Sequence, residues 1–127
     1  FVASFVGRSS AFDAVVQAVP GTISAGGTVL WADAARGMLY GTALRAFVRP
    51  EEVRLGAAAN GLPGAMPMVV THLEYLGPTC RLSLERGAFR LEAEAAPDLV
   101  RAVGALPGAE VLAAIPPDRV MVFPGDE

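Results

Sequence analysis

Apolar and polar residues alternate along most of the chain with the two-residue period of half-buried β-strands. The clearest example is the pair of segments 80–85 and 89–95, which flank Arg86-Gly87. A glycine between two alternating runs is typical of a tight turn, so we predict a β-hairpin here. The remaining strands are predicted at residues 11–19, 28–32, 43–49, 53–55, 66–76, 110–115 and 120–123.

Two short segments depart from this alternation and indicate helices. Residues 97–103 form one candidate, with Pro97 in the first turn. In residues 1–7, Phe1 and Phe5 stand one helical turn apart and Gly7 follows, which is typical of the end of a helix. Many short strands with frequent turns favour a small barrel, or a pair of barrels, over a sandwich. We therefore expect an all-β domain of short antiparallel strands with one or two short helices.

The predicted strand 66–76 differs from the others because large apolar groups occupy both of its faces. Met66, Met68 and Val70 share one face, and Val69, Leu73 and Tyr75 share the other. A strand that is apolar on both faces must be covered on both, and a small barrel covers only one. The second face is expected to meet a second copy of the chain, a preceding domain or the helix at 97–103. Pro67 confines pairing near the start of this strand to one side.

One segment of the chain is repeated. Residues 48–55, Val-Arg-Pro-Glu-Glu-Val-Arg-Leu, align with residues 115–122, Ile-Pro-Pro-Asp-Arg-Val-Met-Val. In both, proline ends an apolar strand, an acidic residue follows in the turn, and a second short strand begins. The repeat indicates either two related halves that arose by duplication or a common strand–turn–strand arrangement.

Composition excludes several classes of protein. The 127 residues are 53% hydrophobic, so a folded core is expected. Thirteen acidic residues face ten arginines and no lysine, and the arginines are interleaved with acidic residues, which argues against a nucleic-acid binder. The single cysteine, Cys80, cannot form an internal disulfide and suggests a reducing compartment. Glycine and proline interrupt the longest uncharged stretches, so no membrane span is expected.

Candidate catalytic groups are few. His72 is the one histidine, and with Glu74 on the same strand face it could form an acid–base pair or a solvated polar surface. One histidine and one cysteine do not provide the ligands of a structural zinc site. Cys80 alternates with Leu82 and is expected in the core rather than as a nucleophile. The chain has no lysine and hence no standard P-loop, so we do not expect it to be an enzyme.

Four segments, taken in order, resemble the TOBE domain, an OB-like barrel region that follows the ATPase domain of ABC-importer ATP-binding subunits. They are residues 1–7, residues 48–55 with the sequence Val-Arg-Pro-Glu, residues 73–77 followed by Arg81-Leu82, and residues 116–120. The resemblance is strongest to the subunits that serve spermidine/putrescine, iron(III), thiamine and sugar importers. It implies that residues 1–10 are the tail of the helix leaving a missing ATPase domain. Residues 11–58 and 59–127 would then be two OB-like halves.

The resemblance also implies a role and partners. The chain would be a regulatory and dimerisation domain without a cofactor of its own, since ATP and magnesium would be held by the missing ATPase domain. Its partners would be that domain, a second copy of the same subunit and the importer permease, with no nucleic acid. The expected location is cytoplasmic, peripheral to the inner face of the cell membrane.

A related branch of this family binds molybdate or tungstate through a Ser-Ala-Arg-Asn-x-Leu-x-Gly segment. Asn60, Leu62 and Gly64 fit its second half, while residues 57–59 are alanines where that branch has a hydroxyl and a cation. Loss of these donors removes the charge-assisted hydrogen bonds that an oxyanion needs. For this reason the importer role is the main prediction, and a small-ligand or oxyanion-binding module is the alternative, with Arg49, Thr79 or Arg81 among the donors. The candidate ligand or interface residues are Arg49, Glu51, Met68, Tyr75, Thr79 and Arg81.

Overall fold

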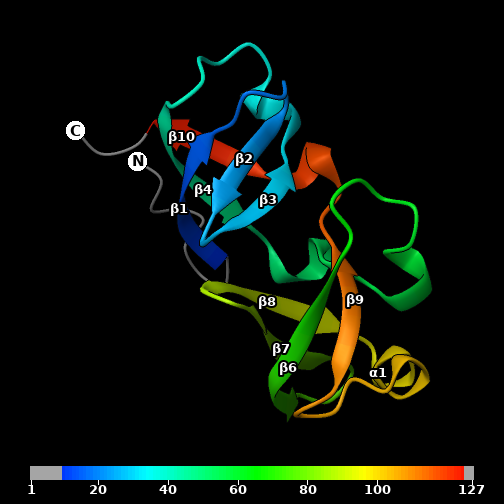
Figure 1. The fold of residues 1–127 in the computed structure, drawn as a ribbon. Helices are drawn as coiled ribbons and strands as arrows, with labels where there is room; N and C mark the ends of the chain where they lie inside the picture. Colours follow the sequence, from blue (N-terminus) through cyan, green and yellow to red (C-terminus); the bar gives the residue numbers. More distant parts are fainter. Residues whose placement is uncertain (1–9, 125–127) are drawn as a thin grey trace.

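A computed structural model describes residues 10–124 and shows two five-stranded antiparallel sheets, one above the other in Figure 1. The first sheet has the order β10-β4-β1-β2-β3 and the second β5-β9-β6-β7-β8. The strands are β1 Ser10–Val16, β2 Thr22–Ala25, β3 Thr28–Trp31, β4 Ala43–Val48, β5 Arg54–Leu55, β6 Met66–Tyr75, β7 Cys80–Arg86, β8 Phe89–Ala95, β9 Glu110–Ala114 and β10 Met121–Pro124. This confirms the expected all-β, OB-like architecture.

The two sheets are built alike and exchange one strand each. Four consecutive strands form the body of each sheet, β1–β4 in the first and β6–β9 in the second. The fifth strand of each half crosses over, so that β5 pairs with β9 and β10 pairs with β4. Within residues 10–124 the halves are therefore intertwined, and neither sheet is complete without a strand from the other. The boundaries at residues 58 and 59 stay a prediction.

The repeated segments are the two crossings. The first runs from β4 through the 3-10 turn η3, Pro50–Glu52, into β5. The second runs from β9 through η5, Pro117–Arg119, into β10. Proline has no backbone N–H to donate to a neighbouring strand, so strand pairing ends at each Pro-acid turn. After the turn the chain continues into the other sheet. The repeat thus marks the points at which the strands are exchanged.

One continuous hydrophobic core holds the two sheets together. Its fully buried side chains come from both, including Ile23, Ala46 and Val48 from the first and Val70, Leu82 and Leu84 from the second. Cys80 is also completely buried, as its alternation with Leu82 predicted. The helix α1, Pro97–Val103, begins and ends where the sequence predicted and buries Val100.

Two predictions about strands in the first half are corrected. The strand predicted over residues 11–19 ends at Val16, and Ala18 beyond it is exposed. The cause is the turn after Val16, in which Thr22 donates its backbone N–H to the Val19 carbonyl. Strand β2 was not predicted because its four residues lie between glycines and are too few to show alternation. The segment 1–7 lies outside the described residues.

The prediction that residues 66–76 are apolar on both faces is wrong. A β-bulge lies between Val70 and His72, where the pairing of β6 with β7 shifts by one residue. Beyond the bulge, Leu73 lies opposite Leu82 and Tyr75 opposite Cys80, so both join the face that carries Val70. Met66, Met68 and Val70 are buried in the core, and Val69 is the apolar residue left on the outer face, 39% exposed. Pairing at Pro67 is one-sided, with β9 alone, as predicted.

Candidate binding loop and the adjoining hollow

The segment that fits the oxyanion-binding pattern forms a loop between β5 and β6. It begins with the 3-10 turn η4, Gly56–Ala58, and Asn60 closes this turn by donating its backbone N–H to the carbonyls of Gly56 and Ala57. The side chain of Asn60 is exposed, whereas Ala59 is fully buried. The loop therefore presents an amide side chain but no charge of its own.

The two ends of this loop pack closely on other elements. A Cβ atom on Gly56 would overlap the side chain of Val103, so α1 lies directly against the loop. At the other end, Gly64 has a φ of +79°, and a Cβ there would lie 3.0 Å from Cδ1 of Trp31. Glycine permits both the left-handed backbone and the close approach. The loop is thereby fixed between α1 and β3.

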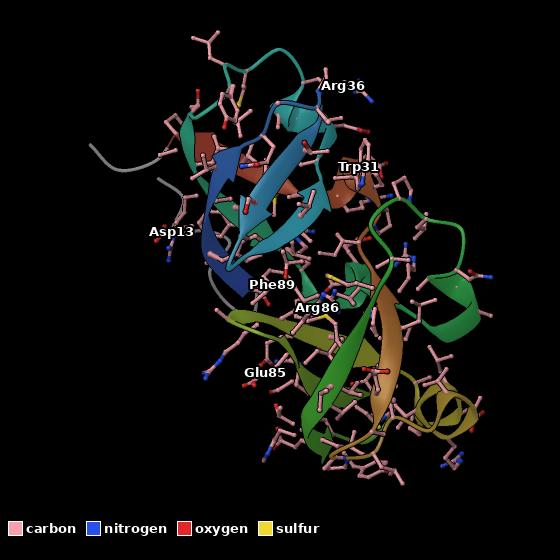
Figure 2. All side chains as sticks on the ribbon, viewed as in Figure 1. Asp13, Trp31, Arg36, Glu85, Arg86 and Phe89 are labelled. Carbon is pink, nitrogen blue, oxygen red and sulfur yellow. The ribbon has the colours of Figure 1, made fainter. Side chains whose placement is uncertain are left out.

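A hollow of about 350 Å³ adjoins the end of the loop, between the two sheets. Its lining combines the β2–β3 turn, the start of β6 and the end of β7: Gly27, Thr28, Val29, Trp31, Gly64, Ala65, Met66 and Arg86. Figure 2 shows Trp31 on β3 and Arg86 in the region where the two sheets meet. Arg86 is the one charged residue of this lining, and no carboxylate belongs to it. Such a lining favours an anion.

Comparison with protein-family models matches residues 46–123 to the TOBE domain. The matched segment is more than half of the chain. The chain belongs to the TOBE domain family. Comparison with the curated proteins gave no match.

Among solved structures, the fold is similar to that of the cytoplasmic molybdate-binding protein ModG in a crystal form with molybdate bound. The TM-score is 0.80 with 20% sequence identity, and the match covers 94% of this chain and 99% of that chain. At this identity the likeness establishes the shared fold. It extends over both sheets, because the matched part is nearly the whole of each chain.

Two of the residues proposed from sequence, Arg49 and Glu51, lie at the first crossing of the TOBE domain. Arg49 is exposed and lines a hollow of about 230 Å³ together with Glu52, Asp118, Arg119 and Met121. Glu52 lies 3.6 Å from both Arg54 and Arg119 and so connects the two crossings electrostatically. The side chain of Glu51 is exposed. Carboxylates balance the arginines here, so the geometry favours a structural contact between crossings over an anion site.

The side chains of Thr79 and Arg81 lie close together, but both contact the carboxylate of Glu94. The Thr79 hydroxyl donates to Oε2 of Glu94 at 3.3 Å, and the Arg81 guanidinium lies 3.9 Å from the same oxygen. Glu94 thus occupies the place that an oxyanion would need. Tyr75 is 57% exposed at the end of β6, and Met68 is buried in the core. These four residues form no common site with Arg49 and Glu51.

The remaining chemical candidates form no reactive cluster in the described residues. His72 lies on the outer face of the second sheet, in a hollow that Glu85, Arg90 and Glu92 also line. Within residues 10–124, no group of three histidine, cysteine or acidic side chains could hold a metal ion. The same part of the chain contains no helix long and apolar enough to cross a membrane. Sequence reasoning missed Thr28, Trp31 and Arg86, because they come from two strands far apart in the sequence, β3 and β7, and match no motif.

Proposed function

We propose that this TOBE domain is a binding module for a small oxyanion. The observation that carries the proposal is the hollow beside Gly64, which one arginine and no carboxylate line. Oxyanions are held by N–H and O–H donors, and a carboxylate in the same place repels them. The fold shared with a molybdate-bound protein supports the proposal, as do Asn60, Leu62 and Gly64 in the loop.

Ligand-induced stabilisation tests this function. A ligand that binds only the folded state at 100 times its dissociation constant stabilises that state by about 2.7 kcal/mol, which raises Tm by several degrees in a domain of this size. Molybdate and sulfate are expected to raise Tm in this way, with spermidine and a simple sugar at equal ionic strength as controls. Equal Tm values in all four solutions would exclude oxyanion binding as the function.

A second candidate is the accessory domain of the ATP-binding subunit of an ABC importer, of the spermidine/putrescine, iron or sugar type. The specific observation is the Val-Arg-Pro-Glu segment at residues 48–51, which forms the first crossing between sheets. In this role the domain contacts its own ATPase domain, a second copy of the subunit and, through the parent chain, the permease at the inner face of the membrane. ATP and magnesium are then held upstream of Phe1. The two candidates are compatible, since an accessory domain that binds a solute can regulate transport.

The gene tests the second candidate most directly. A reading frame that encodes a P-loop upstream of Phe1 in the same polypeptide is the expected finding, and a frame without one contradicts it. Sedimentation of the 127-residue chain at tens of micromolar tests self-association separately. A strict monomer would remove the second copy as a partner of this region.

A further inference from the structure

The two halves of the TOBE domain each contain a niche beside the edge strand of a hairpin. The hairpins β2–β3 and β7–β8 both have two-residue turns, at residues 26–27 and 87–88, so Thr28 corresponds to Phe89 and Trp31 to Glu92. Val15 lies opposite Ser24, and Val69 lies opposite the corresponding Glu85. Val15 and Val69 are therefore equivalent positions in the two halves. Counting back from them along β1 and β6 makes Phe12 equivalent to Met66 and Ser10 equivalent to Gly64.

The niche beside β8 is filled by the protein itself. The backbone N–H of Glu92, which points away from β7, donates to the hydroxyl of Ser10 at 2.9 Å. Next to this bond, the rings of Phe12 and Phe89 meet edge to face with their centroids 5.1 Å apart. Figure 2 shows Phe89 in the region between the two sheets. Side chains thus satisfy the edge amide and occupy the space beside it.

The corresponding niche beside β3 is the hollow already described. Smaller or more flexible residues, Thr28 and Met66, stand where the phenylalanines are, and Gly64 has no hydroxyl to replace that of Ser10. The Ala32 amide donates to the carbonyl of Gly21 at 2.7 Å. Because antiparallel ladder bonds alternate, the Trp31 amide must point away from β2, toward the free edge. Within residues 10–124 this N–H has no backbone acceptor.

A positive charge lies at the same niche. Arg86 stands where the first half has Ala25, and it donates from Nη1 to the carbonyl of Pro67 at 3.2 Å, which leaves other guanidinium N–H groups for a ligand. The neighbouring carboxylate, Glu85, lies on the opposite face of the strand and pairs with Arg90 at 3.2 Å. The Thr28 hydroxyl donates to no side chain or backbone group in the described part of the chain.

We infer that this open niche is the oxyanion site, and that a tetrahedral oxyanion takes the place that the Ser10 hydroxyl fills in the other half. The oxygens of the ligand accept hydrogen bonds from the backbone N–H of Trp31 and from the hydroxyl of Thr28. Arg86 supplies the positive charge that residues 57–59 lack. The inference rests on the proposed function and locates its site. It also predicts one oxyanion for each chain, since the second niche is closed.

Trp31 gives a direct readout, because it is the single tryptophan of the chain and lines the niche. Titration of the 127-residue chain with sodium molybdate and sodium sulfate is expected to change tryptophan fluorescence in a saturable way. Arg86→Gln should weaken binding by about 10- to 100-fold, as loss of a charge-assisted hydrogen bond does. Thr28→Val, which keeps the shape of the side chain, should weaken it by about 2- to 10-fold.

Arg90→Gln is the matched control. It removes the same charge from the same hairpin, but its side chain is 81% exposed and lies outside the niche. Binding by this variant should equal that of the unmodified chain. Calorimetric binding that leaves Trp31 fluorescence unchanged, or that Arg86→Gln and Arg90→Gln affect equally, would overturn this site while the oxyanion function stands. If neither calorimetry nor fluorescence detects oxyanion binding, both the site and the proposed function are overturned.

Discussion

The hydroxyl of Ser10 accepts the backbone N–H of Glu92 at 2.9 Å, across 82 positions of sequence. This bond joins the first strand of one half to the edge strand of the other. It lies beside the Phe12–Phe89 contact, so a polar link and an aromatic link close the same niche. The two halves are thus held together on this side by side chains and, at the crossings, by exchanged strands.

Ser10→Ala should lower the free energy of unfolding by about 1–2 kcal/mol, because the Glu92 amide would lose its acceptor at a largely buried position. Urea denaturation followed by circular dichroism measures this change. Ser24→Ala is the control, since no hydrogen bond of the Ser24 side chain is found in residues 10–124. Equal stability of the two variants would mean that the Ser10 bond contributes nothing.

Gly26→Ala should destabilise the domain more than Gly27→Ala. Both glycines have positive φ, so alanine is strained at either position by roughly 1 kcal/mol. A Cβ on Gly26 would in addition lie 2.9 Å from the backbone of Ala88 and Phe89, whereas a Cβ on Gly27 meets nothing within 4 Å. Thermal unfolding compares the two variants. A lower Tm for Gly27→Ala would show that the two hairpin turns do not approach as described.

Met68→Ala should cost about 2–5 kcal/mol of stability, because Met68 is 1% exposed and its loss leaves a cavity. Val69→Ala, one residue along on the outer face, should cost less than about 1 kcal/mol. Denaturant midpoints measure both. Comparable losses at the two positions would contradict the assignment of faces before the bulge in β6.

Local chemistry made part of this fold predictable from sequence. Alternation fixed the hairpin around Gly87, and Pro97 fixed the start of α1, because these signals act within a few residues. The bulge after Val70 was missed, because the apolar positions change phase between Val70 and Leu73, and this change fits a strand with two apolar faces as well as a strand with one extra residue. The repeat at residues 48–55 and 115–122 was visible, but that it marks a strand exchange depends on long-range pairing.

The candidate site was less accessible to sequence reasoning. Asn60, Leu62 and Gly64 pointed to the loop, because they form a local segment. Arg86 did not stand out, since it was one of ten dispersed arginines and its hairpin position suggested a turn. Its importance comes from the packing of one sheet on the other, which brings the end of β7 beside β3 and Gly64. Only the tertiary structure supplies that proximity.

Isothermal titration calorimetry of the 127-residue chain with sodium molybdate tests the central claim, that this TOBE domain binds a small oxyanion. The account predicts saturable heat with one anion bound per chain, competition by sulfate, and no saturable heat with spermidine at the same ionic strength. No saturable heat with either anion, at protein concentrations of tens of micromolar and anion concentrations up to millimolar, would contradict it.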